Sequence, residues 1–253
     1  MTTYYDQNPY LTRFEWGPEG VRALAPGSDV VVIVDVLTFS TAVDVAVGQG
    51  ATVFPYRWRD ASAERFAREQ RAALAVSRGA TSQEHPFSLS PASLRGLATG
   101  ARLVLPSPNG ATLSLLAAEA GAAVLAGSLR NAAATARAAG ALGRRVTVIA
   151  AGERWPESDT LRPSIEDLIG AGAILSALRE PDPTRSPEAE MALAAFTAAL
   201  ARLRAVLDEC ASGRELRALG FAGDVAVAAE LNASDCVPIL RDGAYVRWAG
   251  PEE

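Results

Sequence analysis

The sequence contains no lysine, and all of its 24 basic residues are arginine. This absence excludes a Schiff-base lysine and a P-loop lysine, so a bound anion must be held by arginine, backbone N–H groups, hydroxyl groups or a metal ion. A single histidine, His85, excludes every site that needs two histidines. The two cysteines, Cys210 and Cys236, fit no metal-binding or redox spacing and favour a reducing compartment.

Long apolar runs are also missing. No run reaches the roughly 18 residues of a membrane span, and the first ten residues, MTTYYDQNPY, lack the basic-then-apolar pattern of a signal peptide. We therefore expect a cytoplasmic protein with no membrane partner. Acidic residues outnumber basic ones by 29 to 24, and the net charge of −5 argues against a nucleic-acid partner.

Apolar, strand-like runs alternate with alanine-rich helical runs over the first two thirds of the chain. The expected strands are residues 30–34, 51–56, 103–105, 122–126 and 146–151. The expected helices between them are residues 41–47, 62–77, 111–120 and 131–142. This alternation predicts an α/β fold with a largely parallel or mixed sheet flanked by helices.

The last third of the chain predicts a helical C-terminal region within a single α/β domain of residues 1–253. Ser164 is expected to cap a helix that ends near Leu178, and Pro187 to begin a long helix that ends near Ala211. Residues 186–232 are a candidate helical subdomain. The chain is expected to close with a β-hairpin formed by residues 237–240 and 245–248.

Small polar residues follow four of the expected strands. They are Asp35, Ser40 and Thr41 after the first strand, Asn109 and Gly110 after the third, Ser128, Arg130 and Asn131 after the fourth, and Glu153 after the fifth. Ligands of open parallel sheets bind beyond the carboxyl ends of the strands, where helix N-termini offer free N–H groups to an anion. The pattern predicts a site for a small anionic substrate.

Four carboxylates near this site could hold a hard divalent cation against the anion. They are Asp35, Glu153, Glu166 and Asp167. Each polar residue also has a structural interpretation. The Asn109-Gly110 pair could be only a turn, Ser128 and Asn131 only helix caps, and the Glu166-Asp167 pair a complement to a helix dipole. His85 and Arg130 could simply be solvated.

Common phosphate-binding motifs are absent. The P-loop motif cannot be completed without lysine, and GQGATV lacks the third glycine of a dinucleotide fingerprint. The segment Asp35-Val36-Leu37 resembles the first motif of haloacid-dehalogenase-type phosphatases, D-x-D-x-[TV]. Leu37 replaces the second aspartate, however, and no lysine exists to hold phosphate, so that family is excluded.

An ordered set of short motifs runs from about residue 30 to residue 240. The set comprises D-V-L with a Ser/Thr-rich turn (35–41), E-H-P-F through S-P (84–91), P-N-G (108–110), G-S-x-x-N (127–131), A-G-E (151–153), E-D-x-x-x-A-G (166–172) and D-x-V-P (235–238). Together these motifs resemble those of the 2-phosphosulfolactate phosphatase (ComB-type) family. Many members of that family carry Arg where this chain has Thr38, so we expect one cation fewer beside the anion pocket.

The resemblance implies a magnesium-dependent phosphohydrolase with an unusual α/β fold. The family's named reaction removes phosphate from 2-phospho-3-sulfolactate on the route to coenzyme M. On this hypothesis Asp35, Glu166 and Asp167 are metal ligands, while Asp35, Glu153 and His85 are catalytic, with His85 as an acid for the leaving group. Asp35 could ligate the metal, orient water or attack phosphorus. The predicted substrate-binding residues are Ser40, Thr41, Asn109, Gly110, Ser128, Arg130 and Asn131.

Other classes of function stay open on the sequence alone. The chain could be a non-catalytic binder of small anions, or an isomerase or lyase that uses Mg²⁺ to steady an enolate. It could also be an interaction protein that uses the helix expected over residues 187–211. That helix has a stripe of apolar residues at helical spacing, which favours core packing or a homodimer. The stripe consists of Leu193, Phe196, Leu200, Leu203 and Leu207.

Overall fold

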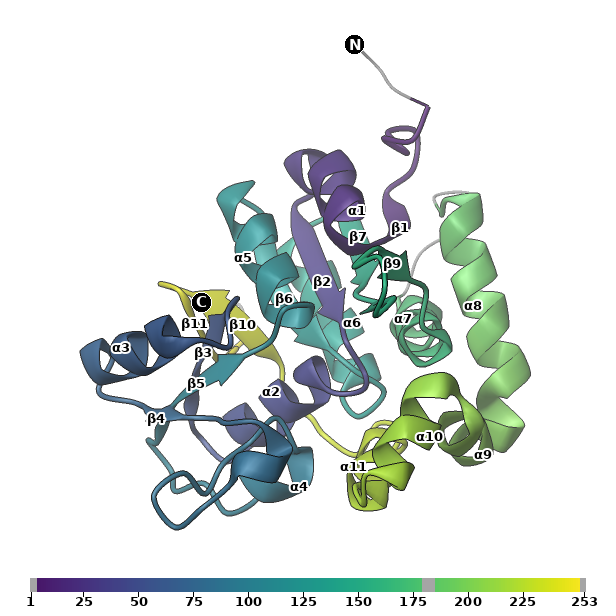
Figure 1. The fold of residues 1–253 in the computed structure, drawn as a ribbon. Coiled ribbons are helices and arrows are strands. Elements are labelled where there is room, and N and C mark those ends of the chain that lie inside the picture. Colours follow the sequence, from purple (N-terminus) through teal and green to yellow (C-terminus); the bar gives the residue numbers. More distant parts are fainter. Residues whose placement is uncertain (1–3, 179–184, 251–253) are drawn as a thin grey trace.

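A computed structural model describes residues 4–178 and 185–250 (Figure 1). Within these residues a nine-stranded sheet lies between two layers of helices, which confirms the predicted α/β class. In sheet order the strands are β1 (Thr12–Trp16), β7 (Val146–Ala150), β2 (Val30–Val34), β6 (Ala123–Gly127), β10 (Pro238–Arg241), β11 (Ala244–Arg247), β3 (Thr52–Tyr56), β5 (Arg102–Pro106) and β4 (Ala73–Leu74).

The sheet consists of two parallel blocks separated by an antiparallel hairpin. Strands β1, β7, β2 and β6 form one block, and β3, β5 and β4 form the other. The predicted hairpin β10–β11 joins them through antiparallel pairs, so the blocks run in opposite directions. The carboxyl ends of β2 and β5 nevertheless meet, because the Gly110 N–H after β5 donates a hydrogen bond to Asp35 after β2 (3.1 Å).

Helices cover both faces of the sheet (Figure 1). Before the C-terminal region they are α1 (Gly17–Leu24), α2 (Phe39–Gly48), α3 (Ala61–Glu69), α4 (Pro91–Leu94), α5 (Gly110–Glu119), α6 (Ala132–Leu142) and α7 (Ile165–Ala177). Helices α6 and α7 pack on the face that contains Val30, Val32 and Val34, while α1, α2 and α5 pack on the face that contains Val31 and Ile33. Strand β2 is apolar at every position because both of its faces are buried.

The C-terminal helices pack beside this sandwich. They are α8 (Pro187–Ala199), α9 (Leu203–Glu209), α10 (Ala211–Ala218) and α11 (Ala222–Ala228). Helix α8 lies along α7, and α9 to α11 lie below it in Figure 1. One apolar cluster extends from β2 and α7 into these helices. Both the single domain over residues 1–253 and the helical subdomain over residues 186–232 stay predictions.

The predicted long helix from Pro187 to Ala211 is wrong. Helix α8 ends at Ala199, a short 3-10 turn follows, and α9 begins at Leu203. The change of direction buries Leu203 and Leu207 in the core, whereas Leu200 in the turn is 48% exposed. The apolar stripe therefore belongs mainly to the core, as its spacing favoured.

Two other local predictions also need correction. The helix expected over residues 62–77 ends at Glu69, because Arg71 adopts a left-handed backbone with φ of 50°, and β4 follows. Ser164 does occupy the N-cap position of α7, but its hydroxyl donates to the Arg162 carbonyl (3.5 Å) instead of capping the helix.

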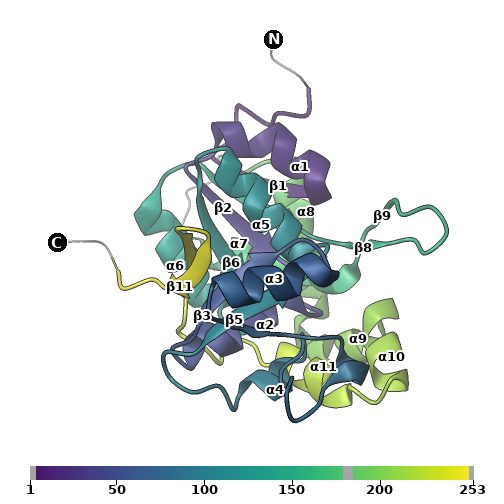
Figure 2. The ribbon, with the colours of Figure 1, turned by 60° about the vertical axis from the view of Figure 1, so that its left-hand side comes forward.

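Several elements were not predicted at all. They include β1, α1 and a small hairpin formed by β8 (Glu153–Arg154) and β9 (Leu161–Arg162). Figure 2 shows that this hairpin extends from the body of the molecule on the same side as α9 and α10. Within the described residues, no helix combines the length and apolarity needed to cross a membrane.

Candidate active site

Asp35 lies directly after β2 and is only 6% exposed. Its Oδ1 accepts a hydrogen bond from the Phe39 N–H (3.0 Å), and its Oδ2 accepts one from the Gly110 N–H (3.1 Å). Burial, together with the nearby charge of Glu166, raises the pKa of Asp35 to about 6, while these two hydrogen bonds act in the opposite direction. Asp35 thus joins the first turn of α2 to the first residue of α5.

Glycine at position 110 permits this contact. A β-carbon at Gly110 would lie 2.2 Å from Cδ1 of the Phe39 ring, which is far inside van der Waals contact. The backbone N–H of Gly110 can therefore reach Asp35 only without a side chain. The predicted Asn109-Gly110 turn thus has a structural role at this strand end.

Asp167, in the first turn of α7, forms hydrogen bonds to the backbone next to Asp35 and Glu153. Its Oδ1 accepts from the Val36 N–H (2.7 Å) and its Oδ2 from the Gly152 N–H (2.8 Å). Burial and the charges of Asp35 and Glu166 raise the pKa of Asp167 well above its usual range. Glu166 is also buried and lies close enough to Asp35 to affect its titration. The predicted acidic cluster therefore does assemble.

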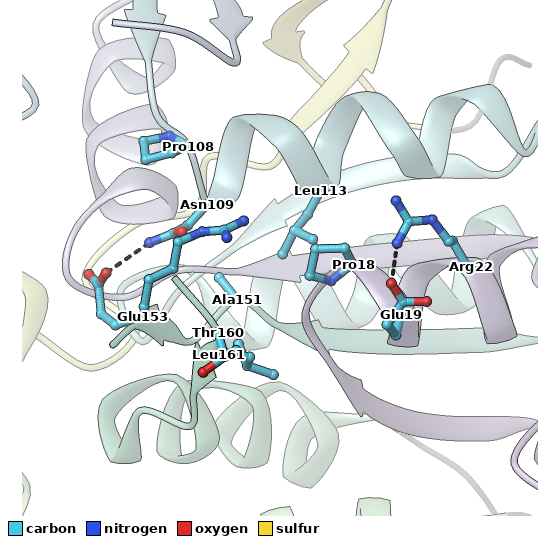
Figure 3. Close-up of a pocket in the computed structure, with 11 residues that line it drawn as sticks. Pro18, Glu19, Arg22, Pro108, Asn109, Leu113, Ala151, Glu153, Thr160 and Leu161 are labelled. Atoms are coloured by element: carbon cyan, nitrogen blue, oxygen red, sulfur yellow. Dashed lines mark hydrogen bonds and ion pairs between the residues drawn. The ribbon is translucent and has the colours of Figure 1, made fainter. Parts of the chain in front are cut away.

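Glu153 begins the β8–β9 hairpin and faces Asn109. The Asn109 Nδ2 donates to Glu153 Oε2 (2.9 Å), as the dashed line in Figure 3 shows. Burial, and after it the charge of Asp35, raises the pKa of Glu153 to about 7, while the Asn109 hydrogen bond and the charge of Arg162 act in the opposite direction. A carboxyl group with a pKa near neutrality is suited to proton transfer.

A pocket of about 560 Å³ opens over these groups. Asp35, Asn109 and Glu153 line one side of it, and Ser212, Glu215 and Leu216 from α10 line another. The helical C-terminal region therefore forms a wall of this pocket. Glu166 and Asp167 are buried and are not among its lining residues.

Four arginines also line the pocket, and no motif in the sequence marks any of them as a site residue. They are Arg59 after β3, Arg78 in the 3-10 turn Arg78–Ala80, and Arg154 and Arg162 in the β8–β9 hairpin. Because the chain has no lysine, a side-chain cation that binds an anion is expected to be arginine. With 24 arginines in the chain, that constraint could not select these four.

A second cavity of about 390 Å³, drawn in Figure 3, shares Asn109 and Glu153 with the first. Its walls are mainly apolar and include Pro18, Leu113 and Leu161. The Glu19–Arg22 ion pair lies at its far end. The Asn109–Glu153 pair therefore lines both cavities.

Four predicted substrate-binding residues are instead occupied by internal hydrogen bonds. The Ser40 hydroxyl donates to the Ile33 carbonyl (2.9 Å), and the Thr41 hydroxyl donates to the Val36 carbonyl (2.8 Å). Asn131 Oδ1 accepts from the Ser128 N–H (2.8 Å), and its Nδ2 donates to the carbonyls of Ala126 and Cys236. All four side chains are fully buried. They shape the strand ends and do not line the pocket.

Two further predicted residues lie away from the pocket. Arg130 donates from Nε to Asp44 Oδ2 (2.9 Å) and also pairs with Glu230, so its charge is already neutralised inside the protein. His85 lies in the loop before α4, where its backbone N–H donates to the Ser82 hydroxyl (3.1 Å). It is not a lining residue of either cavity. The structure gives no support for the role of His85 as an acid.

A sequence model of the family described as 2-phosphosulpholactate phosphatase matches residues 18–243. The chain belongs to this family. A curated relative from Carboxydothermus hydrogenoformans, named "Probable 2-phosphosulfolactate phosphatase", is 32% identical over 225 residues, which cover 85% of this chain and 89% of that protein. The resemblance inferred from the motifs is confirmed. A phosphatase is a phosphoric monoester hydrolase, so membership also favours the predicted hydrolase over a binder, an isomerase or a lyase.

The expectation of one cation fewer beside position 38 is wrong, because another arginine lies next to this position in the folded protein. The Nη2 of Arg78 donates to the Thr38 hydroxyl (2.7 Å), so a guanidinium group lies beside the residue that lacks the arginine of many family members. Arg78 is 40 residues away in sequence, which is why the motif could not reveal it. This member of the phosphatase family therefore keeps a positive charge at this place.

The chemistry of the acidic cluster fits a hard cation. Asp35 and Asp167 are bonded to backbone N–H groups, and no arginine forms an ion pair with Asp35, Glu166 or Asp167 among the residues that the structure describes. Buried carboxylates are usually paired or bound to metal. Within the same residues, no three acidic, histidine or cysteine side chains could hold a metal ion by themselves. Mg²⁺ commonly uses only one or two carboxylates, with water and substrate oxygens as its other ligands.

Proposed function

We propose that this protein is a magnesium-dependent phosphohydrolase that releases phosphate from a small phosphorylated hydroxy acid, 2-phosphosulfolactate or a close relative of it. One observation carries the proposal: two carboxylates of raised pKa, Asp35 and Glu153, line the same pocket as four arginines. The family membership and the name of the curated relative support the reaction and the substrate.

In this proposal Asp35 and Glu166 hold Mg²⁺, and Asp167 positions the backbone around them. Both oxygens of Asp35 are anchored by backbone N–H groups, which fixes the direction of their remaining lone pairs. The chemistry that Mg²⁺ would supply there is the neutralisation of negative charge on the transferred phosphoryl group. Burial is the main cause of the raised pKa values of Asp35 and Asp167, and the repulsion from neighbouring acidic groups adds to it; a bound cation would relieve that repulsion.

The phosphoryl oxygens are held by arginine in place of the missing lysine. Arg59 lines the pocket, and its charge interacts with those of Asp35 and Glu153. Among the described residues no side chain or backbone group accepts a hydrogen bond from Arg59, so its five N–H groups are available to a ligand. A guanidinium binds two oxygens of a phosphate at once, which fixes the orientation of the substrate.

Glu153 is the proton donor of the proposed reaction. Water supplies the oxygen of the new P–O bond, and the bond between phosphorus and the alcohol oxygen breaks. Glu153 gives its proton to that alcohol oxygen and takes one from the attacking water. Its hydrogen bond from Asn109 holds the carboxyl group at the pocket, and its pKa of about 7 allows both transfers near neutral pH.

Phosphate release from 2-phosphosulfolactate, measured with Mg²⁺ and with EDTA, tests the proposal. We expect turnover only with Mg²⁺, and a loss of at least about 100-fold in kcat for Asp35→Asn and for Glu153→Gln. Glu64→Gln is the matched control, because the Glu64 side chain is 63% exposed on α3. Full turnover in EDTA would remove the metal from the mechanism, and unchanged turnover in Asp35→Asn would remove Asp35.

The composition of the chain bears on its cellular setting and its partners. We propose that it acts in the cytoplasm on a small anionic substrate, without a nucleic-acid partner, and that it forms a homodimer. Both cysteines are free and buried, which is compatible with a reducing compartment. Light scattering of the purified protein tests the homodimer, since a single species of about 26 kDa would contradict it.

A further inference from the structure

Arg78 is held in place from three sides at the edge of the pocket. Its Nε donates to Asp224 Oδ2 (3.0 Å), and its Nη2 donates to the Thr38 hydroxyl (2.7 Å). Its guanidinium carbon lies 5.4 Å from the centre of the Phe221 ring. Thr38 lies in the turn between β2 and α2, whereas Phe221 and Asp224 lie at the start of α11. Arg78 therefore connects the end of a sheet strand to the C-terminal helices.

The partner of Arg78 is itself deeply buried. Asp224 is 2% exposed, and its Oδ1 accepts hydrogen bonds from the Ser90 hydroxyl (2.5 Å) and the Ala92 N–H (3.5 Å). Desolvation makes a buried ion pair an inefficient source of stability. Such a pair can instead serve to hold one cation at a defined position.

Part of the Arg78 guanidinium remains available to a ligand. An arginine side chain has five N–H groups, and the contacts to Asp224 and Thr38 use only two of them. Within the described residues no group accepts a hydrogen bond from Nη1 of Arg78. Because Arg78 lines the same pocket as Asp35 and Glu153, these free N–H groups can reach a molecule bound there.

A second cation lies next to Arg78 in the pocket. Burial, and after it the charge of Arg78, lowers the pKa of Arg59, so the two guanidinium groups are close enough to repel each other. Arg59 also interacts with the charges of Asp35 and Glu153, whereas Arg78 is bound to Thr38 and Asp224. The pocket therefore has one cation beside the acidic cluster and another farther from it.

We propose that Arg78 binds a second anionic group of the substrate, a carboxylate or a sulfonate, while the phosphate is held at Arg59 and the acidic cluster. This inference rests on the proposed function and assigns a specificity-determining residue to it, Arg78. Asp224 is the positioning residue, since it directs the guanidinium towards the pocket. Arg78 thereby selects against phosphate esters whose other end is neutral.

The kinetic test compares two secondary phosphate esters. 2-Phosphosulfolactate carries a carboxylate and a sulfonate, whereas glycerol 2-phosphate has two neutral arms. We expect Arg78→Gln to lower kcat/KM for 2-phosphosulfolactate by about 10- to 100-fold more than for glycerol 2-phosphate, the range for loss of a charge-assisted hydrogen bond. Arg65→Gln, a charge change at a side chain that is 70% exposed on α3, should change neither value.

A binding test is independent of turnover. Calorimetric titration with 3-sulfolactate, which has both acidic groups but no phosphate, should give a Kd about 10-fold or more higher for Arg78→Gln than for the wild type. Because Arg78→Gln leaves Asp224 buried without its cation, the double variant Arg78→Gln/Asp224→Asn removes the pair as a unit and provides a folded alternative. Arg78→Lys keeps the charge but cannot form the same set of contacts, so partial recovery is expected.

The outcomes separate this inference from the proposed function. If Arg78→Gln and the double variant lose equally on both esters and bind 3-sulfolactate as the wild type does, Arg78 has no role in recognition, and the phosphatase proposal stands. If the wild type releases phosphate from neither ester, the phosphatase proposal fails. The titration with 3-sulfolactate then decides alone whether Arg78 forms an anion site.

Discussion

Replacing Glu153 with glutamine should stabilise the metal-free protein at alkaline pH while it removes activity. Glutamine has the same shape and keeps an oxygen that can accept the hydrogen bond from Asn109. What it removes is a negative charge in a partly buried place beside Asp35, and these are the two main causes of the raised pKa of Glu153. The substitution therefore isolates the free energy that the ionised carboxylate costs the folded state.

The magnitude follows from the pKa. The folded protein holds the Glu153 proton up to a pKa of about 7, whereas the unfolded chain releases it near 4.5. Wild-type stability is therefore lost as the pH rises from 4.5 to 7, and the loss is complete above pH 7. At about 1.36 kcal/mol per pKa unit, and with some screening by solvent, the stability gained by Glu153→Gln is about 2–3 kcal/mol at pH 8.5. At pH 4.5 the same estimate falls below about 0.5 kcal/mol.

Urea unfolding in EDTA, followed by circular dichroism at pH 8.5 and pH 4.5, measures both differences. Other titrating groups are present in both proteins and largely cancel in the comparison. The control Glu64→Gln changes an exposed carboxylate and should show only a small difference at either pH. The reasoning is refuted if Glu153→Gln is no more stable than the wild type at pH 8.5, or if its advantage is the same at both values of pH.

Three other outcomes follow from the same structure. Mg²⁺ at 100 times its Kd should raise the stability of the wild type by about 2.7 kcal/mol at pH 8, and that of Asp35→Asn much less; equal shifts in thermal melting would argue against Asp35 as a ligand. Arg130→Ala strands the buried Asp44 and should cost about 3–5 kcal/mol in urea unfolding; normal stability with impaired substrate binding would restore its predicted substrate role. Gly110→Ala forces a methyl group against Phe39 and should cost at least about 1–3 kcal/mol, whereas an unchanged unfolding midpoint would show that the backbone relaxes freely there.

The alternating part of the fold was predictable because its signals are local. Strand β2 is apolar at every position since both faces are covered, and the observed strand has the predicted bounds, Val30–Val34. The errors arose where local signals were weak. The end of α3 depends on the backbone of Arg71, and the break between α8 and α9 depends on the burial of Leu203 and Leu207 against other elements.

The candidate site was predictable in part. Asp35, Asn109 and Glu153 meet as the strand-end rule predicts, although the two blocks of strands run in opposite directions. Ser128 and Asn131 obey the same rule yet bond each other in the core. The sequence does not distinguish a polar residue that faces a ligand from one that stabilises a turn. The hydrogen bonds of such a residue depend on its neighbours in space, which the local sequence does not specify.

The sequence by itself determined the α/β class and the family, and it placed Asp35 at the end of a buried strand in a chain without lysine. Each of these depends on residue type and short spacing. Only the tertiary structure decided which arginines line the pocket, because Arg59 follows β3, Arg162 belongs to the β8–β9 hairpin, and Arg78 is held by the buried Asp224 of α11. The physical reason is that a binding site is formed by contacts between residues far apart in sequence, whereas sequence motifs reveal only relations between residues close together in it.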